Sequence, residues 1–481
     1  MRSSSPNNAA RTAHVIGAGV NGLSAAIVLA QAGVRVDVWE AEAQAGGAAR
    51  TLPLTLPEFH HDFGAAVLPT AAGSPFLLQL PLHKYGLRWV NSPAPVAHPL
   101  DDGTAVVLER DLNAACGALG PDGEAWRSLV GDLSARWAEF AAEILQPVVH
   151  VPRHPLLLAG FGLHAVRSAQ AVAARFKSSR TRALWAGLAA HSFLPLDATA
   201  SAAPALVLAA AAHAVGWPMP LGGAQSLTEA LMVHLKSLGG VVHTSARVHR
   251  VGELVQYSGE AGPVLADVSP RQLLGLAPDM DSAGYKKTLR RFRAGPGIFK
   301  VDYALSEAIP WRAADCGRAL TVHLGGSFEE IAAGEEATAT GRLAERPFVL
   351  LVQPTLFDAS RAPQGKHIAW AYCHIPYGST ANMTAVIDAQ IERFAPGFGE
   401  CVLARHTMGP VELAARDANL AGGDISGGAM DLRQLVWRPT LGGYGTPDER
   451  LYICSSSTPP GGGVHGMCGY HAAEAALRRW K

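Results

Sequence analysis

Residues 14–50, HVIGAGVNGLSAAIVLAQAGVRVDVWEAEAQAGGAAR, decide the fold of this chain. The apolar run His14–Ile16 predicts a strand, and Leu23–Gln31 places small and apolar residues at helical spacing. Val34–Trp39 alternates apolar and polar side chains, which predicts a second strand. The stretch therefore indicates a strand–turn–helix–strand unit of an α/β domain.

Glycines and one acid in this unit indicate what it binds. Gly17, Gly19 and Gly22 form a G-x-G-x-x-G turn between the first strand and the helix. Such a turn lets the backbone approach a pyrophosphate and presents the positive end of a helix dipole to it. Glu40 closes the second strand, where a carboxylate accepts a hydrogen bond from a ribose 2′-hydroxyl and repels a 2′-phosphate. We therefore expect a dinucleotide without that extra phosphate.

The continuation indicates which dinucleotide. Gly46-Gly47 and then Arg50 resemble the second glycine pair and the arginine of the FAD oxidoreductases related to amine oxidases and phytoene desaturases. The resemblance implies that the glycine pair lies against the pyrophosphate, with the arginine near it. Ala48 stands where many of these relatives have Arg. We expect FAD as the cofactor.

Composition limits the other function classes. The 481 residues carry 40 Lys+Arg and 40 Asp+Glu, so no global positive field favours nucleic acid. Only 17% of residues are charged, and no apolar run is long enough to span a bilayer. The polar Met1–Ala13 lacks the apolar core of a signal peptide, and the six cysteines show no paired spacing. These features predict a cytoplasmic protein with reduced thiols.

The next segment, Phe59–Ala66, contains two adjacent histidines and a glycine. In the resembling family it passes beside the flavin ring, which implies a cofactor contact at Gly64, Ala65 and Ala66. His60 and His61 point to opposite faces if the segment is a strand, and no Cys/His set completes a metal site. We expect no metal.

Residues 120–217 are predicted to be helical. The expected helices are Glu124–Leu145, Leu156–Phe176, Thr181–Ser192 and Pro204–Val215, and the last of these is apolar nearly all round. It is either buried or in contact with lipid. A basic cluster between apolar segments is either a solvated helix end or a collar at a membrane surface; its members are Arg175, Lys177, Arg180 and Arg182. Peripheral membrane contact of residues 155–217 is one expectation.

Residues 220–251 return to an α/β pattern. An amphipathic helix with Leu227, Leu231 and Leu235 precedes Gly239-Gly240, and a β-rich run follows. In the resembling family the counterpart strand returns to the cofactor domain, where the backbone of a valine contacts adenine. Val248 occupies that position.

Further strands are predicted at Gly297–Leu305, Phe348–Gln353 and His367–His374, followed by a helix at Ala385–Phe394. We place the strands in a second, mixed sheet that forms the floor of a substrate cavity. Side-chain alternation puts Lys300 on one face together with Ile298 and Asp302. In related amine oxidases a lysine on the corresponding strand holds a water against flavin N5, which makes Lys300 the candidate catalytic residue. The alternative is a lysine on an edge strand that reaches solvent or pairs near Asp302.

The C-terminus repeats a strand–glycine loop–helix pattern. Leu451–Cys454 predicts a strand, and Val464–Trp480 predicts a helix after a loop rich in Gly and Pro. Free N–H groups at that helix start would suit the electron-rich edge of a flavin. The expected cofactor contacts are Gly462, Gly463 and Val464, and the alternative is a purely structural unit.

Taken with VIGAGVNGL, AGGAART and LYICSSSTPPGGGVHGMCG, the chain resembles phytoene desaturase-related FAD oxidoreductases, near the desaturase-like carotenoid ketolases and pyridine nucleotide-disulphide oxidoreductase-like proteins. The resemblance implies an α/β fold: a Rossmann-type, glutathione reductase-like FAD-binding domain interleaved with a substrate domain of mixed sheet and helices. We expect the first domain at 12–70, 220–295 and 430–481, and the second at 71–219 and 296–429. Ser455-Ser456-Ser457 departs from the Gly-Ala-Gly frequent in relatives.

Four functions remain open from the sequence. The first is an FAD-dependent oxidoreductase that removes hydride from a hydrophobic small molecule such as a polyene or terpenoid. The second is an amine or amino-acid oxidase, although Gly463 stands where those enzymes have the second aromatic residue of a pair. The others are a non-redox flavin isomerase and a catalytically idle flavoprotein that acts as a binding partner. The substrate, the electron acceptor and the oligomeric state do not follow from the sequence.

Overall fold

The computed structural model describes residues 12–258, 262–441 and 443–480. The sequence predicts no signal peptide in Met1–Ala13, and residues 1–11 of that segment lie outside the described residues. Within the described residues no helix has both the length and the apolar character needed to cross a membrane. The six cysteines are buried and unpaired.

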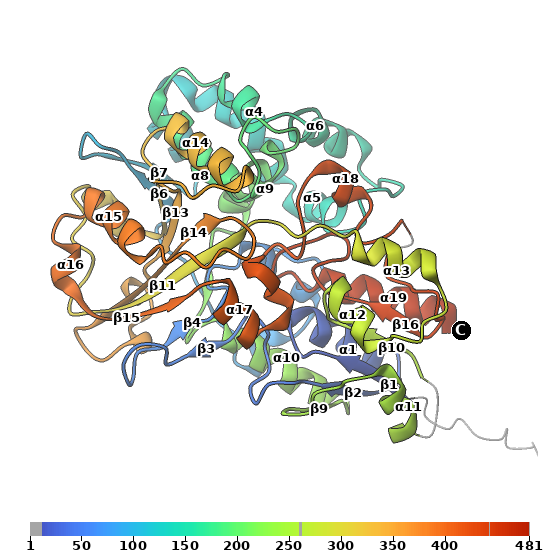
Figure 1. The fold of residues 1–481 in the computed structure, drawn as a ribbon. Coiled ribbons are helices and arrows are strands. Elements are labelled where there is room, and N and C mark those ends of the chain that lie inside the picture. The colour runs from blue at the N-terminus through green and yellow to red at the C-terminus, as the bar shows by residue number, and fades with distance from the viewer. Residues whose placement is uncertain (1–11, 259–261, 442, 481) are drawn as a thin grey trace, which may run out of the picture.

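A five-stranded parallel sheet forms the cofactor half of the molecule, with the strand order β16-β10-β1-β2-β9. Its strands are β1 (Thr12–Ile16), β2 (Arg35–Trp39), β9 (Val241–His243), β10 (Val264–Ala266) and β16 (Leu451–Ile453). Segments that lie far apart in the sequence therefore meet side by side in one sheet (Figure 1). All five strands fall inside the three segments expected for the cofactor domain.

Helices cover both faces of this sheet. Val15 of β1 packs into a core with α1 (Val20–Gln31), α10 (Gln225–Ser237) and α19 (Met467–Trp480). The neighbouring Ile16 packs on the opposite face with α11 (Val251–Ser258), α12 (Pro270–Leu276) and α13 (Ala283–Arg290). This alternation follows from the period of two along a strand, and it explains why β1 is apolar throughout. Leu227, Leu231 and Leu235 of α10 are fully buried, as their spacing predicts.

A seven-stranded mixed sheet forms the other half, with the order β15-β11-β14-β13-β12-β6-β7 (Figure 1). Its strands are β6 (Ala94–Pro99), β7 (Ala105–Leu108), β11 (Gly297–Leu305), β12 (Ala319–Leu324), β13 (Val349–Val352), β14 (His367–Ile375) and β15 (Val402–Met408). Neighbours are antiparallel except β12 and β6. The pairs β3 (Thr51–Leu52) with β4 (His61–Asp62), and β5 (Trp89–Val90) with β8 (Met219–Pro220), lie outside both large sheets.

A helical lobe stands over one face of the mixed sheet, at the top of Figure 1. Its helices are α3 (Leu112–Ala118), α4 (Gly123–Ala135), α5 (Trp137–Ile144), α6 (Pro155–Ala165), α7 (Ala169–Ala173), α8 (Ser179–Ala190), α9 (Ala202–Ala214) and α14 (Phe328–Ala339). The remaining helices are short or peripheral: α2 (Pro69–Ala72), α15 (Thr384–Phe394), α16 (Phe398–Cys401), α17 (Pro410–Arg416) and α18 (Leu432–Val436).

Four expectations about elements need correction. The expected helix Glu124–Leu145 is two helices, α4 and α5, because Arg136 between them has non-helical backbone angles. Leu156–Phe176 is also two, α6 and α7, because Ser168 leaves the helix and caps α7 by accepting from Ala171 N. The β-rich run after Gly240 contains only the short β9, and a helix begins at Val251. The last helix begins at Met467, three residues later than Val464.

Candidate functional site

The glycine turn has the geometry that a dinucleotide site requires. Gly17 has φ +94°, and a Cβ on Gly22 would lie 2.0 Å from the carbonyl oxygen of Gly17. The turn and α1 therefore pack too closely for any other residue at Gly22. Gly19 provides no side chain to cap α1, and within the first turn the N–H of Gly22 donates to the side chain of Asp267. Gly46 pairs with Gly19 through an isolated β-bridge.

A cleft of about 340 Å³ opens at this turn. Six of the residues expected to contact the cofactor line it: Gly17, Gly19, Glu40, Gly47, Arg50 and Val248. They come from the β1 turn, the end of β2, the segment before β3 and the segment after β9. The carboxyl ends of parallel strands are where such folds bind ligands, so the cleft lies where the sheet topology predicts it.

Glu40 and Arg50 are ordered by backbone groups. Glu40 is only 8% exposed, and its two oxygens accept hydrogen bonds from Ala18 N at 2.8 Å and Glu42 N at 2.9 Å. Each carboxylate oxygen retains capacity for another donor. Arg50 donates to Gly47 O at 2.8 Å and to Arg416 O at 2.7 Å. Arg50 therefore fixes the glycine pair from the side, and its guanidinium is largely occupied.

Asp267 is a residue of this cleft that sequence reasoning missed. It follows β10 directly, and its Oδ2 accepts a hydrogen bond from Gly22 N at 3.0 Å. Burial, together with repulsion from Asp417 and Glu40, raises the pKa of Asp267 to about 8. The available signal was an acid directly after the buried run VLA, at the carboxyl edge of the sheet.

A second cavity, of about 500 Å³, lies between the cofactor half and the helical lobe. It is lined at one side by Gly64, Ala65, Ala66, Gly462, Gly463 and Val464, which are the expected flavin contacts. Gly64 N and Ala65 N donate to Ala48 O, so this side of the cavity continues directly from the Gly46-Gly47 pair. The structure thus places one group of expected cofactor residues along the cleft and the other along the adjoining second cavity.

His465 supplies an independent test of whether a flavin fits here. Its Nδ1 accepts from the backbone N–H of Met467 at 3.0 Å, which assigns the ring proton to Nε2. That Nε2 is buried next to the backbone of Gly461 and Gly462, and it makes no well-aligned hydrogen bond within the described residues. Burial lowers the pKa of His465 to about 4, so the ring is neutral at physiological pH. A buried donor without a well-aligned partner beside Gly463 suits an electron-rich ligand edge, and the residues therefore fit FAD.

Lys300 is buried inside the mixed sheet. β11 lies between β15 and β14, which excludes the edge-strand interpretation. The side chain is 1% exposed, forms an ion pair with Asp302, and lies 5.2 Å from the centre of the Trp370 ring. Lys300 and Asp302 share a face, as the alternation predicts, but Lys300 does not line either cavity.

The floor of the second cavity is the mixed sheet, and its wall is apolar. Thr321, Leu350, Trp370 and Tyr372 reach it from three adjacent strands. The rings of Trp370 and Tyr372 lie 5.8 Å apart and nearly parallel, but as alternate residues of β14 they share one wall. Among the described residues that line this cavity, the single acidic side chain is Glu143.

That acid is already occupied by its own surroundings. Glu143 Oε2 lies 2.7 Å from His150 Nε2, and Oε1 accepts from the backbone N–H groups of Arg153 and His154. It therefore fixes the loop between α5 and α6. This leaves the cavity without a free anion to hold an ammonium group.

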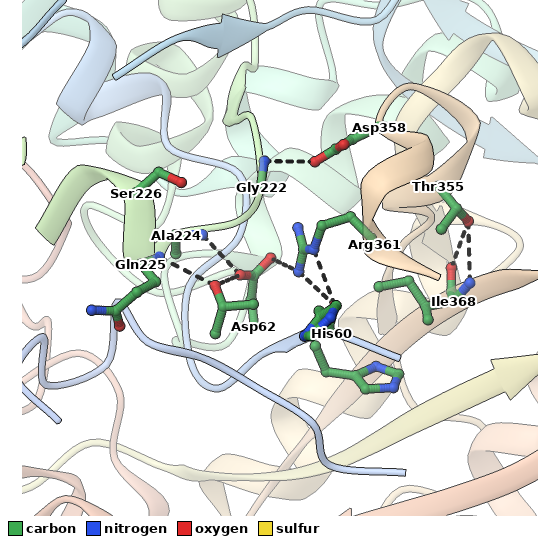
Figure 2. A network of polar contacts seen from close by, with 12 residues as sticks. His60, Asp62, Gly222, Ala224, Gln225, Ser226, Thr355, Asp358, Arg361 and Ile368 are labelled. Atoms are coloured by element: carbon green, nitrogen blue, oxygen red, sulfur yellow. Dashed lines mark hydrogen bonds and ion pairs between the residues drawn. The ribbon is translucent and has the colours of Figure 1, made fainter. Parts of the chain in front are cut away.

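A buried polar network, here called the clasp, joins the two halves next to the cofactor site (Figure 2). Asp62 of β4 forms an ion pair with Arg361 at 3.0 Å, and both side chains are at most 1% exposed. Asp62 Oδ1 also accepts from Ala224 N, just before α10, and Arg361 donates to His60 O. Asp358, near Arg361, accepts from Gly222 N at 2.7 Å. The clasp holds the start of α10 against the half that contains the mixed sheet.

Residues 15–80 match the family described as NAD(P)-binding Rossmann-like domain. The chain is 27% identical to the pyridine nucleotide-disulfide oxidoreductase domain-containing protein 2 of Mus musculus, covering 97% of this chain and 93% of that protein. It is also 27% identical to a phytoene dehydrogenase of Streptomyces griseus, covering 94% and 91%.

Solved structures show the same fold. An oxidoreductase from Methanosarcina mazei superposes with a TM-score of 0.64 at 17% identity, covering 97% of this chain and 100% of that one. A redesigned putrescine oxidase gives 0.60 at 16%, covering 98% and 99%. The fold is that of these oxidoreductases. The predicted Rossmann-type dinucleotide-binding domain is confirmed, and the comparisons agree with FAD as the cofactor and with an oxidoreductase.

Proposed function

We propose that the protein is an FAD-dependent oxidoreductase that removes hydride from a hydrophobic small molecule of the polyene or terpenoid class. The observation that carries the proposal is the apolar cavity that extends from the expected flavin position to the helical lobe. Bound FAD supplies the acceptor for the hydride. The protein supplies orientation and the exclusion of water.

Each group of residues has a proposed task. Gly17, Gly19, Gly22, Gly46 and Gly47 admit the pyrophosphate, Glu40 accepts from the ribose, and the backbone of Val248 contacts adenine. Gly64, Ala65, Ala66, Gly462, Gly463 and Val464 contact the ring system. Arg50 orders the glycine pair. Lys300 acts from beneath the floor, through its ion pair with Asp302, on the charge around the flavin site.

An amine oxidase is the less favoured alternative. It needs an anion or a pair of facing aromatic rings to hold an amine near the flavin, whereas Glu143 is occupied and Trp370 and Tyr372 share one wall. This difference favours an uncharged, apolar substrate. The isomerase and the idle flavoprotein differ from the proposed oxidoreductase because neither of them oxidises a substrate.

One experiment separates these functions. The purified protein should be yellow and should release FAD on heating. Anaerobic mixing with a polyene or terpenoid should bleach the flavin band. Mass spectrometry should find a product lighter by two hydrogens, one transferred to FAD as hydride and the other lost to solvent as a proton. Product of unchanged mass without bleaching would indicate an isomerase, and bleaching by amines alone would indicate an amine oxidase. A protein that binds FAD but transforms none of these compounds would contradict the proposal.

We further propose that the protein reaches its substrate at a membrane surface inside the cytoplasm. The basic cluster at 175–182 does not support this, because Arg180 pairs with Asp102 and Arg182 pairs with Glu329. α9 does not support it either, because one side is core and Pro204 and Val207 line the cavity. The supporting feature is an exposed apolar patch around α6, here called the α6 patch, which consists of Val148, Val149, Val151, Leu156, Leu163 and Val166.

The α6 patch adjoins the cavity. Val148 belongs to both, and Leu158 and Phe161 of α6 line the cavity from inside. Arg153 and Arg167 are exposed within the same stretch. An apolar surface with basic residues beside a hydrophobic cavity suits a membrane interface. A lipid-soluble substrate could enter here without crossing water.

A further inference from the structure

Two histidines meet where the helical lobe contacts the cavity floor. His191 directly follows α8, and His323 lies on the cavity-facing side of β12. Their Nε2 atoms are 3.1 Å apart. His191 lines the cavity, while His323 is fully buried behind it. The rings of Trp217 and Phe348 pack against both histidines.

Both rings are neutral at physiological pH. Burial lowers the pKa of His191 to about 3, with a smaller contribution from His374. Burial also lowers the pKa of His323 well below its ordinary value, with contributions from His191 and His98. Two neutral imidazoles that face each other through Nε2 share one proton in that contact. If His323 donates this proton, His191 presents an N–H at Nδ1 to the cavity. If His191 donates it, His191 presents a bare nitrogen there.

The surroundings of His323 determine which of the two histidines donates the hydrogen bond between them. Its Nδ1 is buried and has no partner within the described residues. A Cβ built on Gly187 would lie 2.7 Å from this Nδ1, so a Cα–H of Gly187 points at it. A bare nitrogen accepts such a C–H contact, whereas an N–H there would be an unpaired donor facing another hydrogen. His323 therefore carries its proton on Nε2 and donates to His191.

It follows that His191 carries its proton on Nδ1. That atom makes no hydrogen bond within the described residues, and the His191 side chain is partly exposed, toward the cavity. We propose that His191 Nδ1–H binds an oxygen acceptor of the substrate, a carbonyl above all, in the apolar cavity. The substrate is then an oxygen-bearing hydrophobic molecule and not a pure hydrocarbon. His323 is a positioning residue that sets the proton of His191. This inference rests on the proposed function, since it takes the cavity as the substrate site.

The test compares two ligands of equal shape. Decan-2-one and 2-methyldec-1-ene differ only in C=O against C=CH2, and calorimetry on the FAD-loaded protein measures their affinities. The ketone should bind about tenfold more tightly, as expected for one hydrogen bond in an apolar site. His191→Phe should remove that preference. His83→Phe, which changes an exposed histidine, should keep it.

An infrared measurement tests which of the two rings carries the proton between them. The carbonyl band of 13C-labelled decan-2-one should shift to lower frequency on binding to the unmodified protein, and His323→Leu should weaken the shift. Equal affinity for both ligands with no band shift would overturn the role of His191 and leave the proposed function standing. If neither ligand binds, the hydrophobic substrate cavity itself is contradicted, and the inference falls with it.

Discussion

Asp267 is one of four acidic residues, with Glu40, Glu42 and Asp417, that line a cleft expected to accept a pyrophosphate. Burial raises the pKa of Asp267 to about 8, and the negative charges of Asp417 and Glu40 in the same cleft add to this effect. Asp267 is therefore largely protonated below pH 8. A neutral Asp267 accepts from Gly22 N and does not repel the phosphates. Ionisation would add a negative charge beside them. The affinity for FAD should therefore depend on this one proton.

We expect the FAD dissociation constant to rise above pH 8, by up to about tenfold per pH unit, because only the neutral form binds well. Asp267→Asn keeps the acceptor for Gly22 N but cannot ionise, so its affinity should stay nearly constant between pH 7 and pH 9. Flavin fluorescence during titration of the apoprotein measures both curves. Parallel pH profiles for the two proteins would show that Asp267 does not titrate in this range.

Lys300 combines a structural role with the proposed catalytic one. Lys300→Met leaves Asp302 buried without its cation, which should lower the free energy of unfolding by about 3–5 kcal/mol. We also expect flavin reduction or reoxidation to slow about tenfold or more, equivalent to about 1.4 kcal/mol in the barrier. Urea denaturation and stopped-flow absorbance measure the two effects.

The double variant Lys300→Met/Asp302→Asn separates the roles, because it removes both charges. It should recover much of the stability and should still show slow flavin kinetics. If its half-reactions match those of the unmodified protein, Lys300 serves the fold alone.

Residues whose role depends on local sequence were predictable, and those that depend on distant partners were not. The glycine turn and Glu40 lie within one strand–helix–strand unit, so their spacing carries the information. The burial of Asp267, the proton of His465 and the contact of His191 with His323 arise only when remote segments meet. Lys300 illustrates both cases. Side-chain alternation along the strand predicted which face it shares with Asp302, but its burial depends on the position of β11 between β15 and β14, which the sequence did not reveal.

At the scale of elements, the same reasoning explains which boundaries failed. Periodicity continues through Arg136 and Ser168, where the helix nevertheless ends. α5 packs into the same core as α1 and α19, whereas α7 packs into the core of the helical lobe with α8 and α9. α9 reads as apolar all round because it serves two apolar surroundings, the lobe core and the cavity wall. The sequence pattern alone does not distinguish a helix between a protein core and a cavity from a helix in contact with lipid. The helices themselves were predictable, whereas their breaks and their neighbours were not.

The clasp couples elements of both halves, and breaking it should reveal that coupling. Arg361→Met leaves Asp62 buried without its ion-pair partner, so we expect a loss of about 3–5 kcal/mol in the free energy of unfolding. FAD should also dissociate at a lower temperature, because the clasp holds the segment before Gly64 and the start of α10. Urea denaturation and the temperature dependence of flavin fluorescence measure these effects.

Arg346→Met is the matched control, since Arg346 is exposed, and it should change neither quantity measurably. Arg361→Met combined with Asp62→Asn should cost less than Arg361→Met alone, because no charge is then left unpaired. Equal stability of the Arg361 and Arg346 variants would mean that the clasp contributes nothing to the union of the halves.

At the scale of the whole molecule, three separate segments build the cofactor sheet, and the chain leaves it twice to build the mixed sheet and the helical lobe. The five strands of the parallel sheet lie within the three segments that the family resemblance implies for the cofactor domain, and the division into two domains stays a prediction. The cavity arises between the parts, so its shape was not accessible from sequence. Its apolar wall reaches the α6 patch, and this continuity connects substrate chemistry to the outer surface.

The α6 patch should bind vesicles that contain anionic lipid. Val151 and Leu156 are 91% and 86% exposed, so replacing both with Asp should leave folding intact. Each loses at least about 1.5 kcal/mol of burial in the bilayer interface, which together predicts a drop in partitioning of about a hundredfold. Flotation with phosphatidylcholine/phosphatidylserine vesicles measures it.

The exposed arginines near the α6 patch predict a second property of vesicle binding, its dependence on salt. Arg153 and Arg167 should make the binding weaken with added salt, by about 1 kcal/mol for each arginine that meets the anionic surface. Val411→Asp, at an exposed apolar residue of α17, is the matched control and should float like the unmodified protein. If the unmodified protein stays at the bottom of the gradient at low salt, the α6 patch does not meet lipid. Substrate would then have to enter the cavity from water or from a carrier.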